Sequence, residues 1–223
     1  MEIIDFKIGE YSKILTFQTD LFDNLIEEKK KKEKGREFIL IGEHYPVITL
    51  GRRAKISNIL VSEQELNKRG IFLHKIGRGG DVTYHCPGQL IVYPILDLEA
   101  HRLGVKDYVF ILEESVLNLL KKYGIEGDRI EGATGVWIGK GTGNERKICA
   151  IGIKCSHFCT MHGIALNVNS DLSGFDLINP CGFQDKGVTS LEKETGNPLN
   201  MNKVKIDLLN EFLKFLKNYR RNS

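Results

Sequence analysis

Hydrophobic side chains recur every three or four residues in three long segments, which is the spacing of one face of an α-helix. These segments, 11–32, 104–123 and 203–219, are predicted to be helices that cover a core. A shorter helix is predicted after Ser62, because Glu65 three residues later completes a capping box. In the last long segment the residues expected to face the core are Ile206, Leu209, Phe212, Leu213 and Leu216.

Shorter apolar runs bounded by glycine, proline or polar turns predict β-strands. They fall within residues 3–6, 38–42, 43–52, 71–76, 91–98, 135–139, 147–154 and 161–168. Several runs follow one another through short turns, with a glycine-rich hairpin at 140–146, so antiparallel neighbours are expected. We therefore predict an α+β (mixed α/β) fold, with a partly antiparallel mixed sheet flanked by helices. No repeat or linker interrupts the chain, so one domain is expected over 1–223.

The turn at residues 77–80, Gly-Arg-Gly-Gly, stands out between two predicted strands. Glycine lets a ligand approach the backbone closely, and Arg78 supplies a cation at the same place. The apolar run 91–98 follows soon after and is expected to hold the turn in a fixed position. The sequence therefore predicts a substrate pocket at this turn.

Cysteine is the best nucleophile in the chain at neutral pH. Cys181 lies between proline and glycine in a predicted loop, where its side chain is expected to be accessible to a substrate and not packed in the core. Cys149 and Cys155 sit in or near a strand and are expected to pack as small hydrophobic groups. Cys86, in the glycine-rich region itself, is the rival candidate. A thiol is mostly protonated at neutral pH, and Lys147, at the start of a strand, is the candidate for activating Cys181. An exposed lysine at a strand end is the competing interpretation of Lys147.

A metal site is conceivable at Cys155, His157 and Cys159, which would share one face of an extended strand, with His162 close by. Their spacing matches no C-x-x-C pair and no second cluster completes four ligands, so we predict no metal. His44, His85 and His162 either orient a carbonyl in a cleft or are structural. The chain has no G-x-x-x-x-G-K-[ST] phosphate loop, so no nucleotide or other cofactor is expected, and the substrate should arrive already activated.

Composition narrows the class of protein further. The 223 residues are 41% hydrophobic and 27% charged, an ordinary globular balance, and a net charge of +3 is too small to indicate nucleic-acid binding. No apolar run is long enough to span a membrane and the N-terminus does not resemble an export signal, so we expect a cytoplasmic protein without a membrane partner. Five cysteines are then better interpreted as reduced thiols than as disulfides.

Motifs along nearly the whole chain resemble the lipoyl (octanoyl) transferases, which belong to the biotin/lipoate protein ligase superfamily. The resemblance is carried by residues 43–47, 78–85, 87–89, 147–152, 161–169 and 179–182. It implies that an octanoyl group moves from octanoyl-acyl carrier protein to Cys181, whose pKa Lys147 lowers, and then to a lysine ε-amine. The implied acceptors are lipoyl domains of 2-oxoacid dehydrogenase E2 subunits and the glycine cleavage H protein. The implied substrate contacts are Arg78, Gly79, Gly80, Asp81, Val82, Thr83, Tyr84, His85, Ala150, Ile151, Gly152, Gly163, Ile164 and Ala165.

Two positions depart from the family pattern. Cys86 stands where glycine is usual, which predicts a second thiol close to the pocket, and the hairpin 139–146 is longer and more polar than usual. The alternatives to octanoyl transfer are an ATP-dependent lipoate-protein ligase, a lipoyl-protein amidotransferase and a non-catalytic module that binds carrier domains. We expect a monomer.

Overall fold

The computed structural model describes residues 1–179 and 186–219. Their largest element is an eight-stranded mixed sheet in the order β1-β2-β6-β10-β9-β8-β7, with β11 paired to β9. The β1–β2 and β9–β11 pairs are parallel and the other pairs are antiparallel. The strands are β1 (Glu2–Gly9), β2 (Phe38–His44), β6 (Gln89–Ile95), β7 (Asp128–Ile130), β8 (Ala133–Ile138), β9 (Arg146–Ser156), β10 (Cys159–Asn167) and β11 (Gly187–Val188).

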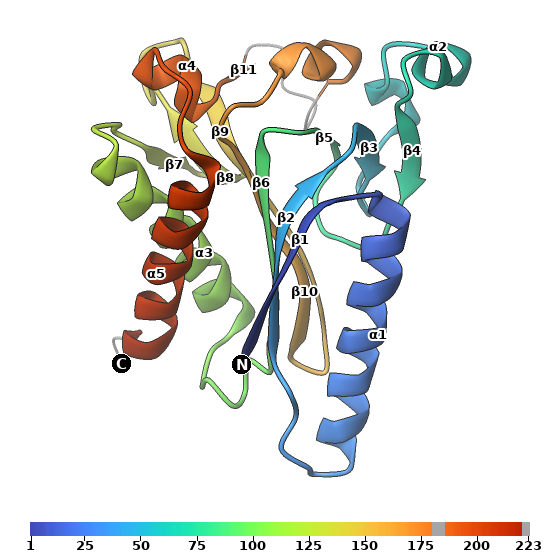
Figure 1. Ribbon diagram of the computed structural model, residues 1–223, viewed down its shortest axis with the longest axis vertical. Helices are drawn as coiled ribbons and strands as arrows, with labels where there is room; N and C mark the ends of the chain where they lie inside the picture. The colour runs from blue at the N-terminus through green and yellow to red at the C-terminus, as the bar shows by residue number, and fades with distance from the viewer. Residues whose placement is uncertain (180–185, 220–223) are drawn as a thin grey trace.

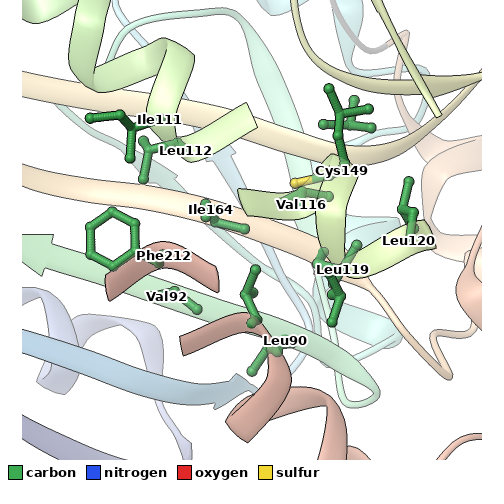
Figure 2. Packing of buried hydrophobic residues seen from close by; sticks show 14 of the residues in the cluster. Leu90, Val92, Ile111, Leu112, Val116, Leu119, Leu120, Cys149, Ile164 and Phe212 are labelled. Carbon is green, nitrogen blue, oxygen red and sulfur yellow. The ribbon is translucent and has the colours of Figure 1, made fainter. Parts of the chain in front are cut away.

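Helices cover both faces of this sheet (Figure 1). One face carries α3 (Val105–Lys122) and α5 (Met201–Asn218), and the other carries α1 (Tyr11–Lys30). The strands between them alternate, so Ile39 of β2 packs toward α3 and α5 whereas Leu40 packs toward α1. Figure 2 shows Val116 of α3 and Phe212 of α5 in the cluster over the central strands. Because both faces are buried, these strands are nearly continuous apolar runs.

A second, three-stranded sheet in the order β4-β3-β5 lies beside the large one. It consists of β3 (Val47–Leu50), β4 (Phe72–Lys75) and β5 (Val82–His85), with β4 parallel and β5 antiparallel to β3. The short helices α2 (Glu63–Lys68), η1 (Ile56–Asn58) and η2 (Leu172–Leu177) join this part of the fold, and α4 (Leu191–Thr195) precedes α5. The predicted mixed sheet flanked by helices is confirmed, but its division into two sheets was not predicted.

Local signals for helix ends agree with the structure. The Ser62 hydroxyl accepts a hydrogen bond from the Glu65 N–H at 3.2 Å, as expected of an N-cap. The chain turns at Gly70 with φ of +67°, a conformation that glycine adopts at little cost. No helix among residues 1–179 and 186–219 combines the length and the apolar character needed to cross a bilayer.

The predicted face of the last helix is partly wrong. Ile206 is 60% exposed, while Val204 and Leu208 are fully buried together with Phe212. Two charged residues share that buried face because each has an ionic partner: Lys205 pairs with Asp5 at 3.3 Å and Glu211 pairs with Lys122 at 2.8 Å. Hydrophobic spacing could not reveal these long-range ion pairs, and so it misjudged the side of α5 that faces the core.

Candidate active site

A cavity of about 450 Å³ opens between the two sheets. The small sheet contributes the turn 78–81 and β5, the large sheet contributes β6, β8, β9 and β10, and α1 contributes Tyr11 at its first turn. Segments separated by more than one hundred residues in the chain therefore meet at one place. Of the predicted residues, the cavity wall includes Arg78, Gly79, Gly80, Asp81, Val82, Thr83, His85, Lys147, Ala150, Ile151, Gly152, Gly163, Ile164 and Ala165.

Two predicted residues are not in this described wall. Tyr84 lies in the core of the small sheet, where its ring packs edge-on against Phe175 with the centroids 5.6 Å apart. Alternation along β5 explains this, because Thr83 and His85 face the cavity and the side chain between them points away. Cys181 lies outside the residues that the structure describes, whereas Lys186, five positions later, lines the cavity.

Arg78 is a buried cation in the cavity wall. Its guanidinium donates to the Thr49 carbonyl at 2.8 Å and to the Thr49 hydroxyl at 2.9 Å, and a third hydrogen bond of 3.0 Å reaches the Gly79 carbonyl. The turn also approaches β9 closely, since a Cβ at Gly152 would lie 3.1 Å from the Arg78 Cδ and 3.1 Å from the Gly79 oxygen. Glycine at position 152 therefore lets the two sheets close around the cation.

Lys147 also stands in the cavity wall, where groups of β8 contact it. Its Nζ lies 4.6 Å from the centroid of the Trp137 ring and donates to the Thr134 carbonyl at 3.3 Å. On the other edge of β9, Lys147 pairs with Val188 of β11. This lysine is therefore not a side chain projecting into solvent from a strand end; it stands in the cavity wall against an aromatic ring.

Three buried histidines lie close together near the Arg78 side of the cavity. The His85 Nδ1 is 2.7 Å from the Gln89 Oε1, and the His44 Nε2 is 3.0 Å from the Tyr93 hydroxyl. His85 and His162 line the cavity, and His44 lies behind it, which makes His44 the structural histidine of the three. The His162 Nδ1 is buried without a hydrogen-bond partner among the described residues.

Burial keeps these imidazoles neutral. It lowers the pKa of His44 to about 4 and the pKa of both His85 and His162 to about 3. The Arg78 charge lowers the pKa of His85 and His162 further. The two histidines therefore offer only neutral hydrogen-bonding groups. The charged side chains of the described cavity wall are Arg53, Arg78, Asp81, Lys147 and Lys186.

A model of the lipoyl protein ligase A/B catalytic domain matches residues 11–213. The octanoyltransferase of Bacteroides fragilis is 49% identical to the chain over 209 residues, which is 94% of this chain and 95% of that protein. The chain belongs to the lipoyl protein ligase A/B family. The resemblance to octanoyltransferases expected from the motifs is thereby confirmed.

Solved structures show the same fold at low sequence identity. Lipoate-protein ligase A bound with ATP aligns with a TM-score of 0.67 at 15% identity, covering 100% of this chain and 89% of that one. A bi-partite lipoate protein ligase from Thermoplasma acidophilum, reported with its E2 lipoyl domain, aligns with a TM-score of 0.66 at 16% identity, covering 99% and 85%. The fold expected for this family is confirmed.

Cys86 and Cys149 are poor candidates for a nucleophile. Cys86 is buried in the core of the small sheet and is absent from the cavity wall, and burial raises its pKa to about 12. The expectation of a reactive second thiol at the pocket is therefore not supported. Cys149 packs in the large core under α3, as predicted, and burial raises its pKa strongly (Figure 2).

The metal-binding hypothesis assumed that residues 155–159 run straight, and that assumption is wrong. His157 and Phe158 form the turn between β9 and β10, with φ of +51° and +61°. His157 is consequently exposed while Cys159 is buried, so the three side chains do not share a face. Among residues 1–179 and 186–219, no group of three or more metal-ligating side chains is arranged to hold an ion.

Sequence reasoning missed several residues of the cavity wall. Trp137, the sole tryptophan of the chain, and Tyr11, at the start of α1, were not predicted to face the cavity. Tyr93 lies in the predicted apolar run 91–98, and Gln89 belongs to the motif 87–89 but was not predicted as a substrate contact. Trp137 carried a usable signal, since its strand is bounded by glycines and precedes the strand of Lys147.

The neutral histidines predict a loss of stability in mild acid. Each folded-state pKa lies below the ordinary value of 6.5, so the unfolded chain binds more protons and stability falls as the pH drops below 6.5. We expect each histidine to remove about 2 kcal/mol from the free energy of unfolding between pH 7 and pH 5. Urea titrations at both values measure this. His162→Gln should reduce the difference in unfolding free energy between pH 7 and pH 5 by about 2 kcal/mol. Equal stability of the wild type at the two pH values would contradict the prediction.

Proposed function

We propose that this protein transfers an octanoyl group from octanoyl-acyl carrier protein to a lysine ε-amine on a lipoyl domain, through a thioester on Cys181. The observation that carries the proposal is the single cavity in which a cationic glycine-rich turn, an apolar wall and Lys147 meet. It is supported by the 49% identity to an octanoyltransferase over nearly the whole chain. Residues 1–223 act as one catalytic domain.

The fatty chain binds against the apolar part of the cavity wall. Ala150 and Ala165 are paired across β9 and β10, on the face of the sheet toward α1. Small alanine side chains leave space on the sheet that an acyl chain can fill. Burying six methylenes at about 0.8 kcal/mol each contributes roughly 5 kcal/mol to binding, so each methylene missing from a shorter chain weakens binding by about 0.8 kcal/mol.

Lys147 activates the thiol of Cys181 by its charge. A unit positive charge about 4 Å from a thiolate stabilises it by roughly 4 kcal/mol at an effective dielectric near 20. The described residues flanking Cys181 support this role. Asn179 donates its N–H to the Asn58 carbonyl at 2.8 Å, Asn58 bonds the Asp81 carboxylate of the cavity wall at 2.6 Å, and Val188 pairs with Lys147.

The chemistry proceeds in two exchanges at the acyl carbon. The Cys181 thiolate attacks the carrier thioester, a new carbon–sulfur bond forms, and the carrier leaves as a thiolate that takes up a proton. The acceptor lysine, as a neutral amine, then attacks the acyl-enzyme, which forms an amide, releases a proton and returns the Cys181 sulfur. Both steps start from an activated thioester, so neither needs ATP.

The acceptors are lipoyl domains of 2-oxoacid dehydrogenase E2 subunits and the glycine cleavage H protein, and the enzyme acts as a monomer. Support for this class of partner comes from the Thermoplasma ligase of the same fold, which was reported with its E2 lipoyl domain.

The direct test is an intact mass of the wild-type protein after incubation with octanoyl-acyl carrier protein in the absence of ATP. We expect the mass to rise by one octanoyl group, and free octanoate with ATP to give no adduct. Octanoylation of an added lipoyl domain that requires free octanoate and ATP would identify a ligase instead. Loading from an octanoyl-lipoyl protein but not from the carrier would identify an amidotransferase, and carrier binding without any adduct would identify a binding module.

A further inference from the structure

α3 lies over β8 and β9 and buries a carboxylate against them (Figure 1). Glu113 is only 8% exposed, and both of its oxygens are paired. Oε1 accepts a hydrogen bond from the Gly135 N–H at 3.0 Å, and Oε2 accepts one from the Arg129 Nε–H at 2.7 Å. Burying a charge is costly unless it is paired in this way, so the two contacts hold Glu113 in one place against β8.

The peptide that contacts Glu113 also contacts Lys147. The Gly135 N–H and the Thr134 carbonyl belong to one trans peptide unit, so they point in opposite directions. The N–H end faces the Glu113 carboxylate, and the carbonyl end accepts the Lys147 Nζ at 3.3 Å. A negative charge at the N–H end polarises the peptide and makes its carbonyl a better acceptor for the ammonium.

The backbone at this peptide requires glycine at position 135. Gly135 has φ of +121°, and a Cβ there would lie 2.4 Å from the Cys149 oxygen and 3.6 Å from the Lys147 Cε. The Trp137 ring beneath the ammonium is itself fixed, because its Nε1–H donates to the Ala133 carbonyl at 2.8 Å. The Thr134 carbonyl and the Trp137 ring therefore both contact the ammonium, and Glu113 contacts the peptide to which that carbonyl belongs.

We propose that Glu113 is a positioning residue that holds the Lys147 ammonium in the cavity through the Thr134–Gly135 peptide. The effect on catalysis rests on the proposed function, in which Lys147 activates Cys181. Arg129 also contacts this carboxylate, at 2.7 Å, and offsets part of its charge.

The kinetic test compares Glu113→Gln with Glu114→Gln. Glu114 binds the same arginine, Arg129, at 2.7 Å, whereas Glu113 also accepts a hydrogen bond from Gly135. Comparing the two variants therefore separates the effect of the Gly135 contact from the effect of losing an ionic partner of Arg129. For Glu113→Gln we expect acylation at pH 7 to slow about tenfold and the midpoint of the pH–rate profile to rise by about one unit, with recovery in alkali. Glu114→Gln should keep the wild-type profile. An unchanged Glu113→Gln profile, or a loss that is equal at every pH, would overturn the proposal.

A second measurement does not depend on the acyl transfer. The Trp137 ring shifts the NMR signals of the Lys147 Hε protons upfield while the ammonium lies over it, and Lys147→Arg assigns those signals. We expect Glu113→Gln to reduce this shift, and wild-type signals in that variant would refute the positioning role. Should Glu113→Gln fail to fold, Glu113→Asp, which keeps the charge but shortens the reach, should show the same loss. If the wild type forms no adduct on Cys181, the proposed function fails while the NMR result still decides the role of Glu113.

Discussion

Replacing Cys181 with serine is expected to lower octanoyl transfer by about a thousandfold or more and to eliminate the octanoyl adduct from the intact mass. A serine hydroxyl does not ionise near neutral pH, so a nearby ammonium cannot turn it into a comparable nucleophile. The acyl chain, the carrier and the cavity wall are unchanged in this variant. Single-turnover acylation by octanoyl-acyl carrier protein, followed by mass spectrometry and peptide mapping, measures the effect.

Cys155→Ser is the matched control for this prediction. Cys155 is a partly exposed thiol of β9 that does not line the cavity, so its loss should leave both the rate and the adduct unchanged. An undiminished adduct on Cys181→Ser would show that another group carries the acyl chain. The ligase alternative predicts the opposite result, because an ATP-dependent ligase should keep its activity when Cys181 is replaced.

Replacing Lys147 with alanine is expected to slow acylation about thirtyfold at pH 7 and to restore much of the rate in alkali. The direction of this pH dependence follows from the positive charge of Lys147. An ammonium near a thiol lowers the pKa of the thiol, and without it the pKa returns toward about 8.5, where only about three per cent is thiolate at pH 7. Above that value the thiol ionises unaided. The rate of acylation measured from pH 6 to pH 10 tests this profile.

Lys154→Ala is the corresponding control. Lys154 lies in the same strand, and its Nζ also stacks on an aromatic ring, 4.8 Å from the centroid of Phe22, but it is not part of the cavity wall. We expect this variant to keep the wild-type pH profile. A loss in Lys147→Ala that is the same at every pH would assign Lys147 to substrate binding and would contradict its role in ionising the thiol.

Local sequence patterns predicted most of the elements correctly. The segments around α1, α3 and α5 show helical spacing, and Ser62 caps α2 as expected, since periodicity and caps depend on neighbours within a few residues. Ile206 was misplaced because the buried face of α5 accommodates Lys205 and Glu211 through partners distant in the chain. The strands of the small sheet resemble those of the large one in sequence, so their separate pairing was not predictable.

The residues of the candidate site were likewise only partly predictable from the sequence. The glycine-rich turn at Arg78 and the strand start at Lys147 carry recognisable residue types in sequence, and the structure brings them to one cavity. Trp137, Tyr11 and Glu113 were missed because a tryptophan in a strand, a tyrosine at a helix start and a glutamate on a helix are ordinary in themselves. Their roles come from what lies opposite them in the fold.

By itself, the sequence of this protein determined its helices, most of its strands, the family to which it belongs and the residue types available for acyl transfer, because these depend on short-range spacing and on motifs. The tertiary structure decided which strands form the second sheet, which side of α5 is buried and which groups hold the Lys147 ammonium. Those outcomes depend on burial and hydrogen bonding between segments far apart in the chain, where each group competes for partners that no local pattern specifies.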